Sequence, residues 1–198
     1  MAKIRVVTIG RRFCTGGSEI GKMVAEKLGV NCYDRELVEQ AAEKVGISMT
    51  DVVKYEESLM NRLKTPINLF GQAELTIPEK IFAAEAEIIM DICSKESSCV
   101  IVGRCADYIL KNKVKTLNVF ITASHDKRAQ TAAEKHGFEY DQIDDILKKY
   151  DNKRSRFYNA NTNKEWGGID SYDMCLDSGK LGYEMCADII VKTVEMSK

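Results

Sequence analysis

The sequence has little proline, with only Pro66 and Pro78 among 198 residues, and no proline-rich, repeated or low-complexity segment. No shift in composition therefore marks a linker, and the length suits one domain with inserts. The sequence also lacks any apolar run of about 18 residues, the length that a membrane-spanning helix needs. We expect a single domain over residues 1–198 that does not associate with membranes.

Charge of one sign is not in excess, because 29 Lys and Arg face 30 Asp and Glu. This balance argues against a partner that is a nucleic acid polymer or an anionic membrane. The 7 cysteines are odd in number and form no Cys-x-x-Cys pair, which disfavours a disulfide framework and a zinc site. The first residues lack the apolar core and cleavage pattern of a secretory signal, so we expect a cytoplasmic protein with reduced thiols.

Short apolar segments alternate with helical patterns along the chain. The apolar segments predict strands at residues 3–9, 31–33, 99–102, 114–122 and 172–176. The helix after the first strand has Ser18 as its expected N-cap. This alternation predicts an α/β domain, a three-layer sandwich around a mostly parallel five-stranded sheet, because helical crossovers cover both sheet faces. Ligands of such folds bind at the carboxyl ends of the strands.

A glycine-bearing loop follows the first strand and reads Gly10-Arg11-Arg12-Phe13-Cys14-Thr15-Gly16-Gly17-Ser18. Glycines let successive backbone N–H groups converge on a phosphate, and the helix N-terminus adds about half a positive charge. On the P-loop pattern, Arg11 takes the first glycine position, Gly17 the lysine position and Ser18 the hydroxyl position that faces magnesium. The pattern indicates a phosphate site without its lysine, and a plain glycine-rich turn stays open.

Several motifs in chain order resemble the cytidylate kinase-like family, bacterial relatives of the nucleoside monophosphate kinases. They are the segment 8–22, Tyr33-Asp34-Arg35-Glu36-Leu37, Val100-Ile101-Val102-Gly103-Arg104, Phe120-Ile121-Thr122-Ala123-Ser124 with Arg128, Trp166-Gly167, the segment 172–178 and Leu181-Gly182. The resemblance covers nearly the whole chain. The Gly-Gly loop departs from that of authentic cytidylate kinases, which carries Gly-Lys-Gly-Thr.

The resemblance implies a P-loop kinase with a helical acceptor-binding insert around residues 35–80 and a short lid near residues 151–170. It implies transfer of the terminal phosphoryl group of ATP, with Mg²⁺, to CMP or a CMP-like nucleotide. Two other functions stay open: a nucleotide-binding sensor or regulatory protein with little or no turnover, and a kinase for a different small molecule. The sequence also leaves open whether the chain forms a homo-oligomer.

Each candidate residue has an expected role, assigned from the resemblance and from its place at a strand end. The residues expected to bind the donor nucleotide are Arg12, Thr15, Gly16, Gly17, Ser18, Glu19 and Arg128, with Ser18 also facing the metal and Arg128 bordering the base. Those expected to bind the acceptor are Asp34, Arg35, Gly103, Arg104 and Asp107. Those expected to act in catalysis are Arg11, Arg154 and Arg156.

Purely structural roles stay open for several of these residues. Asp34 could be an ordinary helix N-cap residue, and Arg104 could be the partner in a surface ion pair. Glu19 could serve only as a negative charge that stabilises the helix N-terminus. The basic residues in 148–156 could simply form a solvent-exposed helix face.

The missing lysine normally places a positive charge beside the β and γ phosphates, so another group must supply that charge. Arg11 is ranked first, because it lies in the turn directly after the first strand and its side chain is long enough to reach back over the loop. Lys22 lies farther along the helix, and Arg154 and Arg156 approach only when a lid closes.

Overall fold

The computed structural model describes residues 3–52, 54 and 75–197. In these residues the strands form one sheet in the order β2-β3-β1-β4-β5, and every neighbouring pair is parallel. The strands are β1 (Val6–Arg11), β2 (Asn31–Tyr33), β3 (Cys99–Val102), β4 (Thr116–Thr122) and β5 (Met174–Asp177). The predicted α/β class and five-stranded sheet are confirmed, and the sheet is parallel throughout.

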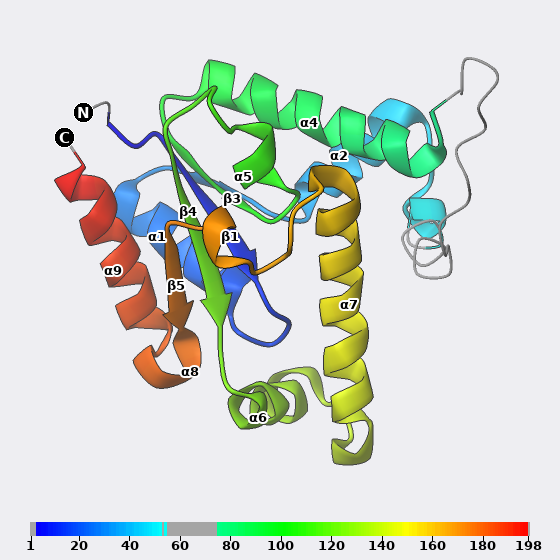
Figure 1. Cartoon of the computed structure of the whole chain (residues 1–198), viewed down its shortest axis with the longest axis vertical. Coiled ribbons are helices and arrows are strands. Elements are labelled where there is room, and N and C mark those ends of the chain that lie inside the picture. The colour runs from blue at the N-terminus through cyan, green and yellow to red at the C-terminus, as the bar shows by residue number, and fades with distance from the viewer. Residues whose placement is uncertain (1–2, 53, 55–74, 198) are drawn as a thin grey trace.

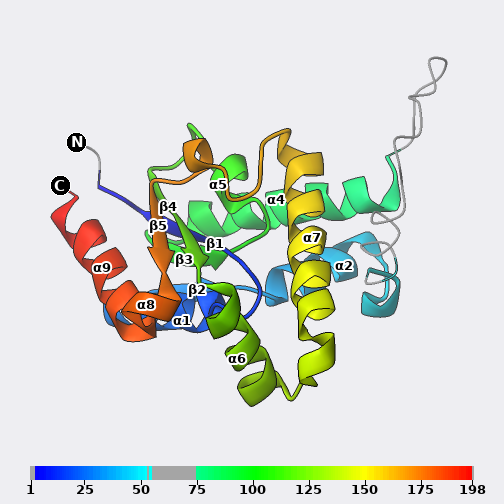
Figure 2. The ribbon, with the colours of Figure 1, turned by 60° about the horizontal axis from the view of Figure 1, so that its bottom comes forward.

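Helices cover both faces of this sheet (Figures 1 and 2). They are α1 (Gly17–Leu28), α2 (Glu36–Val45), α4 (Ile77–Lys95), α5 (Ala106–Ile109), α6 (His125–His136), α7 (Ile143–Thr162), α8 (Ser178–Leu181) and α9 (Tyr183–Met196). Two short 3₁₀ turns, Tyr140–Gln142 and Ile169–Ser171, flank α7. None of the helices among the described residues is both long and apolar enough to span a membrane.

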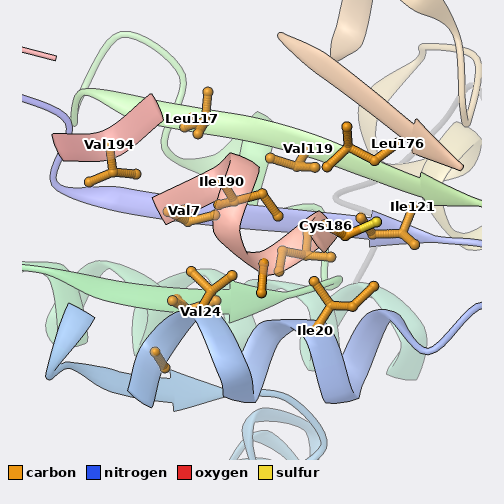
Figure 3. Packing of buried hydrophobic residues seen from close by; sticks show 14 of the residues in the cluster. Val7, Ile20, Val24, Leu117, Val119, Ile121, Leu176, Cys186, Ile190 and Val194 are labelled. Carbon is orange, nitrogen blue, oxygen red and sulfur yellow. The ribbon is translucent and has the colours of Figure 1, made fainter. Parts of the chain in front are cut away.

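One face of the sheet packs against α1 and α9 (Figure 3). Val7 and Val119 point from the strands toward this layer, where Ile20 of α1 and Ile190 of α9 are wholly buried. Burying a Val or Ile side chain stabilises a fold by about 1.5–3 kcal/mol. This packing fixes the start of α1 against the end of β1, and the loop between them is therefore held at both ends.

The opposite face packs against α2, α4 and α5. Val6 and Ile101 alternate with the residues of the first face and contact a cluster that includes Leu37, Ile89 and Ile109. The alternation follows from the two-residue period of a strand, and a parallel strand covered on both faces is apolar at nearly every position. The two layers leave the carboxyl ends of the strands uncovered, and α7 runs past them (Figure 1).

Some sequence-based boundaries were wrong. Ser18 is not the N-cap of α1, because the helix begins at Gly17 and Gly16 takes the cap position without a side-chain hydrogen bond. The strands β4 and β5 each begin two residues later than expected. Residues 151–162 of the expected lid belong to the continuous helix α7, and residues 53 and 55–74 of the expected insert lie outside the described residues.

Candidate functional site

The loop between β1 and α1 presents a row of backbone donors. The N–H groups of residues 14–19 donate no hydrogen bond to any group in the part of the chain that the structure describes. Gly16 has φ +71°, a left-handed conformation that glycine adopts without strain. The Thr15 hydroxyl is committed to the Arg12 carbonyl at 2.8 Å, so Thr15 offers its backbone only. Free N–H groups at a helix N-terminus make an anion site.

A carboxylate of α7 holds the start of this loop. Asp151 accepts hydrogen bonds from the Phe13 N–H at 2.8 Å and from the Arg12 Nε at 3.1 Å. Arg128 donates to the same carboxylate at 2.6 Å and to the Phe13 carbonyl at 2.8 Å. The Arg128 side chain is only 3% exposed, so it supports the loop from within instead of presenting a face to a nucleotide base.

Aromatic stacking fastens the loop to α7 a second time. The ring of Phe13 stacks on Tyr150 with centroids 4.1 Å apart. Arg154 also lies over the Phe13 ring, with its guanidinium 5.5 Å from the ring centroid, and donates to the Arg11 carbonyl at 3.1 Å. Burial and the nearby Arg11 lower the pKa of Arg154 to about 9. The helix thus places a desolvated cation beside the loop.

A cavity of about 560 Å³ lies between α7 and the carboxyl ends of β1, β2 and β3. Its basic lining residues are Arg11, Arg35, Arg104, Lys149, Lys153, Arg154 and Arg156. The carboxylates Asp34 and Asp107 also line it. An excess of cations around a concave site favours an anionic ligand.

The lining brings together the residues that the sequence proposed for catalysis and for the acceptor, namely Arg11, Arg154, Arg156, Asp34, Arg35, Gly103, Arg104 and Asp107. The residues proposed for the donor lie outside this lining: Arg128 is in α6, and the others lie in the adjacent loop and at the start of α1. Among these, Glu19 is half exposed and lies 3.9 Å from Lys135. The β1–α1 loop and the cavity are therefore two neighbouring compartments at the same edge of the sheet.

The sequence profile of the cytidylate kinase-like family matches residues 6–180. The chain belongs to this family. It is similar to the cytidylate kinase of Methanocaldococcus jannaschii (23% identity over 98% of this chain and 99% of that protein). It is also similar to the cytidylate kinase of Archaeoglobus fulgidus (25% identity over 97% of this chain and 96% of that protein).

Solved structures share the fold. An uncharacterized protein from Eubacterium ventriosum has a TM-score of 0.72 at 25% identity, over 97% of this chain and 99% of that one. Shikimate kinase from Acinetobacter baumannii has a TM-score of 0.57 at 11% identity, over 98% and 95%. The family and the P-loop kinase fold together support a nucleotide kinase, a phosphotransferase.

Two of the arginines that line the cavity are held by ion pairs. Arg11 Nη2 lies 3.0 Å from Asp34 Oδ1, and α2 has Arg35 at its N-cap position, so Asp34 is not a capping side chain. Arg104 lies 3.1 Å from the carboxylate of Glu85, which is wholly buried in α4. The surface ion pair considered for Arg104 is therefore wrong, because its partner lies in the protein interior.

The turn that carries Arg104 has an unusual backbone. Gly103, Arg104 and Cys105 have φ values of +80°, +54° and +54°, three consecutive residues in the left-handed region. A non-glycine residue in this conformation costs on the order of 1 kcal/mol, and such strain gathers at functional sites. The turn aims Arg104 into the cavity, where its guanidinium also lies 5.1 Å from the ring centroid of Phe157.

Aromatic and acidic residues complete the far wall of the cavity. The Tyr158 hydroxyl donates to Asp107 at 2.6 Å, and Trp166 and Tyr172 also line the wall. Burial raises the pKa of the Asp107 carboxyl, and burial together with the hydrogen bond raises the pKa of Tyr158. This wall offers ring faces and one partly buried carboxylate to a ligand.

Replacing Asp151 by asparagine is expected to lower the free energy of unfolding by about 3 kcal/mol, because it leaves the buried Arg128 guanidinium without its charged partner. Urea denaturation followed by circular dichroism measures the change. Asp145→Asn is the control, since Asp145 is exposed on the same helix and should change stability little. Equal stabilities of the two variants would contradict the role given to Asp151.

Proposed function

We propose that the protein transfers the terminal phosphoryl group of ATP, with Mg²⁺, to a nucleoside monophosphate, CMP or a CMP-like nucleotide. The observation that carries the proposal is the junction of two anion sites at one sheet edge: the loop with free N–H groups at residues 14–19 and the basic cavity. Family membership and the two curated cytidylate kinases support it.

The loop suits the triphosphate of the donor. Its N–H groups and the N-terminus of α1 offer donors to phosphate oxygens, as glycine-rich loops do in P-loop enzymes. The Ser18 hydroxyl forms no hydrogen bond with the described residues, which leaves it available to a metal ion. Mg²⁺, when bound, neutralises phosphate charge and orients the phosphate oxygens.

The cavity suits the acceptor nucleotide. Its volume of about 560 Å³ lies within the range of small-molecule sites, about 300–1,000 Å³. Arg104 presents a planar guanidinium that can hold a phosphate by two hydrogen bonds, and Phe157 and Trp166 offer apolar surface to a base. Asp107 and Asp34 supply acceptors for amino or hydroxyl groups of the ligand.

Phosphoryl transfer of this kind needs no covalent intermediate on the protein. The residues must align donor and acceptor, neutralise the charge of the transferred group and exclude water. Arg11 and Arg154 lie where the loop meets the cavity, so they are placed to contact phosphates from both sides. The site holds these cations in place before any nucleotide arrives, which lowers the reorganisation that the reaction requires.

Single-turnover transfer from labelled ATP with Mg²⁺, measured against a panel of CMP, dCMP, UMP, AMP and shikimate, tests the proposal. Transfer to the cytidine nucleotides at the highest rate is the expected result. Calorimetric titration with ATP and Mg²⁺ separates binding from turnover. Binding without transfer to any acceptor would favour a sensor or regulatory protein, and the fastest transfer to shikimate would favour a kinase for another small molecule.

A further inference from the structure

The side chain of Arg11 occupies the space in which a side chain at position 17 would begin. A Cβ atom built on Gly17 would lie 2.6 Å from the Cβ and 2.7 Å from the Cγ of Arg11. Carbon atoms at optimal contact are about 3.5–4.0 Å apart, so these two side chains exclude each other. Position 17 is the lysine position of the P-loop pattern. The arginine at position 11 therefore leaves no room for a lysine side chain at position 17.

The far end of Arg11 reaches the acceptor side of the site. A Cβ atom built on Gly103 would lie 2.2 Å from Arg11 Nη1, and Arg11 Nη2 pairs with Asp34 at 3.0 Å. The side chain thus crosses from the loop, past a gap that only glycine leaves at the end of β3, to the end of β2. Gly17 and Gly103 form a cradle for it, one at each end of the side chain.

Arg11 has hydrogen-bonding capacity that the described protein groups do not use. Its Nε is buried and has no hydrogen-bond partner among the described residues, although its side chain lines the cavity and is 18% exposed. Burial lowers the pKa of Arg11, and Asp34 only partly opposes this effect. A cation removed from water normally has polar partners, so a largely buried guanidinium that lines the cavity and pairs with Asp34 there points to an anionic ligand.

We propose that Arg11 replaces the P-loop lysine: the cation that this loop usually carries at the helix start is carried by the last residue of β1, in the cradle of Gly17 and Gly103. The inference rests on the proposed function, and the anion it names is the terminal phosphate of the donor. Arg11 is then a catalytic residue, since it contacts the transferred group, and one oxygen of Asp34 holds its guanidinium between donor and acceptor.

Nucleotide discrimination tests this proposal without turnover. A cation at the terminal phosphate favours ATP over ADP, so Arg11→Ala should lower the ratio of ATP to ADP affinity by about tenfold or more. Arg11→Lys should keep part of that ratio, because it keeps the charge and loses the fork. Calorimetric titration with each nucleotide and Mg²⁺ measures the ratio. An unchanged ratio in Arg11→Ala overturns the proposal, whereas a wild-type protein that binds neither nucleotide overturns the proposed function as well.

Moving the cation from position 11 to position 17 tests whether the Arg11 side chain excludes a side chain at position 17. The double variant Arg11→Gly with Gly17→Lys removes the Cβ that blocks position 17 and returns the cation to the helix start. Arg11→Ala with Gly17→Lys is the matched control, because the alanine keeps the Cβ that lies 2.6 Å from the new side chain. Arg11→Ala alone should slow single-turnover transfer by about 10²–10³-fold, the effect of removing one group that stabilises transition-state charge.

The exchanged variant is expected to recover at least about tenfold of that loss, and the matched control to recover none. Urea denaturation of all variants shows which of them fold. If a double variant does not fold, the transfer rate of Arg11→Ala alone still tests the role of Arg11. An unchanged transfer rate in Arg11→Ala overturns the assignment of Arg11. Equal recovery in both double variants overturns the steric link between positions 11 and 17.

Discussion

Replacing Gly16 by valine is expected to abolish measurable binding of ATP with Mg²⁺. A Cβ at this position would lie 2.1 Å from the Cζ of Tyr183 and 2.5 Å from both Cε atoms, so the loop or the ring must move. The residue also has φ +71°, which a β-branched side chain strongly disfavours. On the proposed function the N–H groups of residues 14–19 bind one phosphate together, so a displaced loop loses that common focus.

The control for this variant is Gly46→Val. Gly46 has φ +73°, nearly the backbone conformation of Gly16, but a Cβ there meets no atom within 4 Å. It carries the same backbone strain at the end of α2, away from the loop, and should bind ATP as the wild type does. Calorimetry on both variants, with urea denaturation to confirm folding, makes the comparison. Wild-type affinity in a folded Gly16→Val protein would end the assignment of the loop as the donor site.

Much of the fold follows from periodicity and composition. The strands at residues 31–33 and 99–102 have the expected bounds. Residues 99–102 are apolar throughout, as expected of a parallel strand buried on both faces. The starts of β4 and β5 were placed two residues too early, because Val114 and Tyr172 before them also favour strands. The N-cap of α1 was misjudged because a left-handed Gly16 starts the helix earlier than Ser18 would.

The predicted cavity residues lie together because the sequence places them at the ends of parallel strands, and those ends share one edge of the sheet. Two buried carboxylates were missed, Glu85, which holds Arg104, and Asp151, which holds the loop after β1, although both have a signal. Glu85 lies midway between Ile81 and Ile89, and Asp151 follows Leu147 by four residues, so each acid interrupts the apolar stripe of a helix. A carboxylate in such a stripe indicates a buried ion pair.

Other features arise only in three dimensions. Tyr183 lies against Gly16 although 167 positions separate them, and no local pattern connects the two. The stem of Arg11 in the space of a Gly17 side chain depends on the exact angle between β1 and α1. The left-handed conformation of Arg104 and Cys105 is imposed by surrounding packing against the preference of both residue types. Propensity alone predicts none of these.

Replacing Arg104 by alanine is expected to weaken binding of the acceptor nucleotide by about 1.5–3 kcal/mol, the range for hydrogen bonds to a charged group. The affinity for ATP with Mg²⁺ should change little, because Arg104 follows β3 and lines the cavity, whereas the loop proposed for the donor follows β1. Calorimetric titration with CMP and with ATP measures both affinities. An ATP affinity that falls as far as the CMP affinity would contradict the division of the site into two compartments.

Two further variants separate phosphate recognition by Arg104 from its support of the fold. Arg104→Lys keeps a positive charge near the buried Glu85 but loses the planar fork, so it should preserve stability better than Arg104→Ala and still weaken CMP binding.

Arg35→Ala removes a cation of the same cavity whose side chain is 79% exposed and pairs with Glu39, so solvent screening should make its effect smaller. Because Arg104 is 23% exposed and its partner is wholly buried, the deeper cation should dominate acceptor affinity. Equal losses of CMP affinity in Arg35→Ala and Arg104→Ala would instead indicate that the cavity attracts its ligand through diffuse charge, without a specific contact from Arg104.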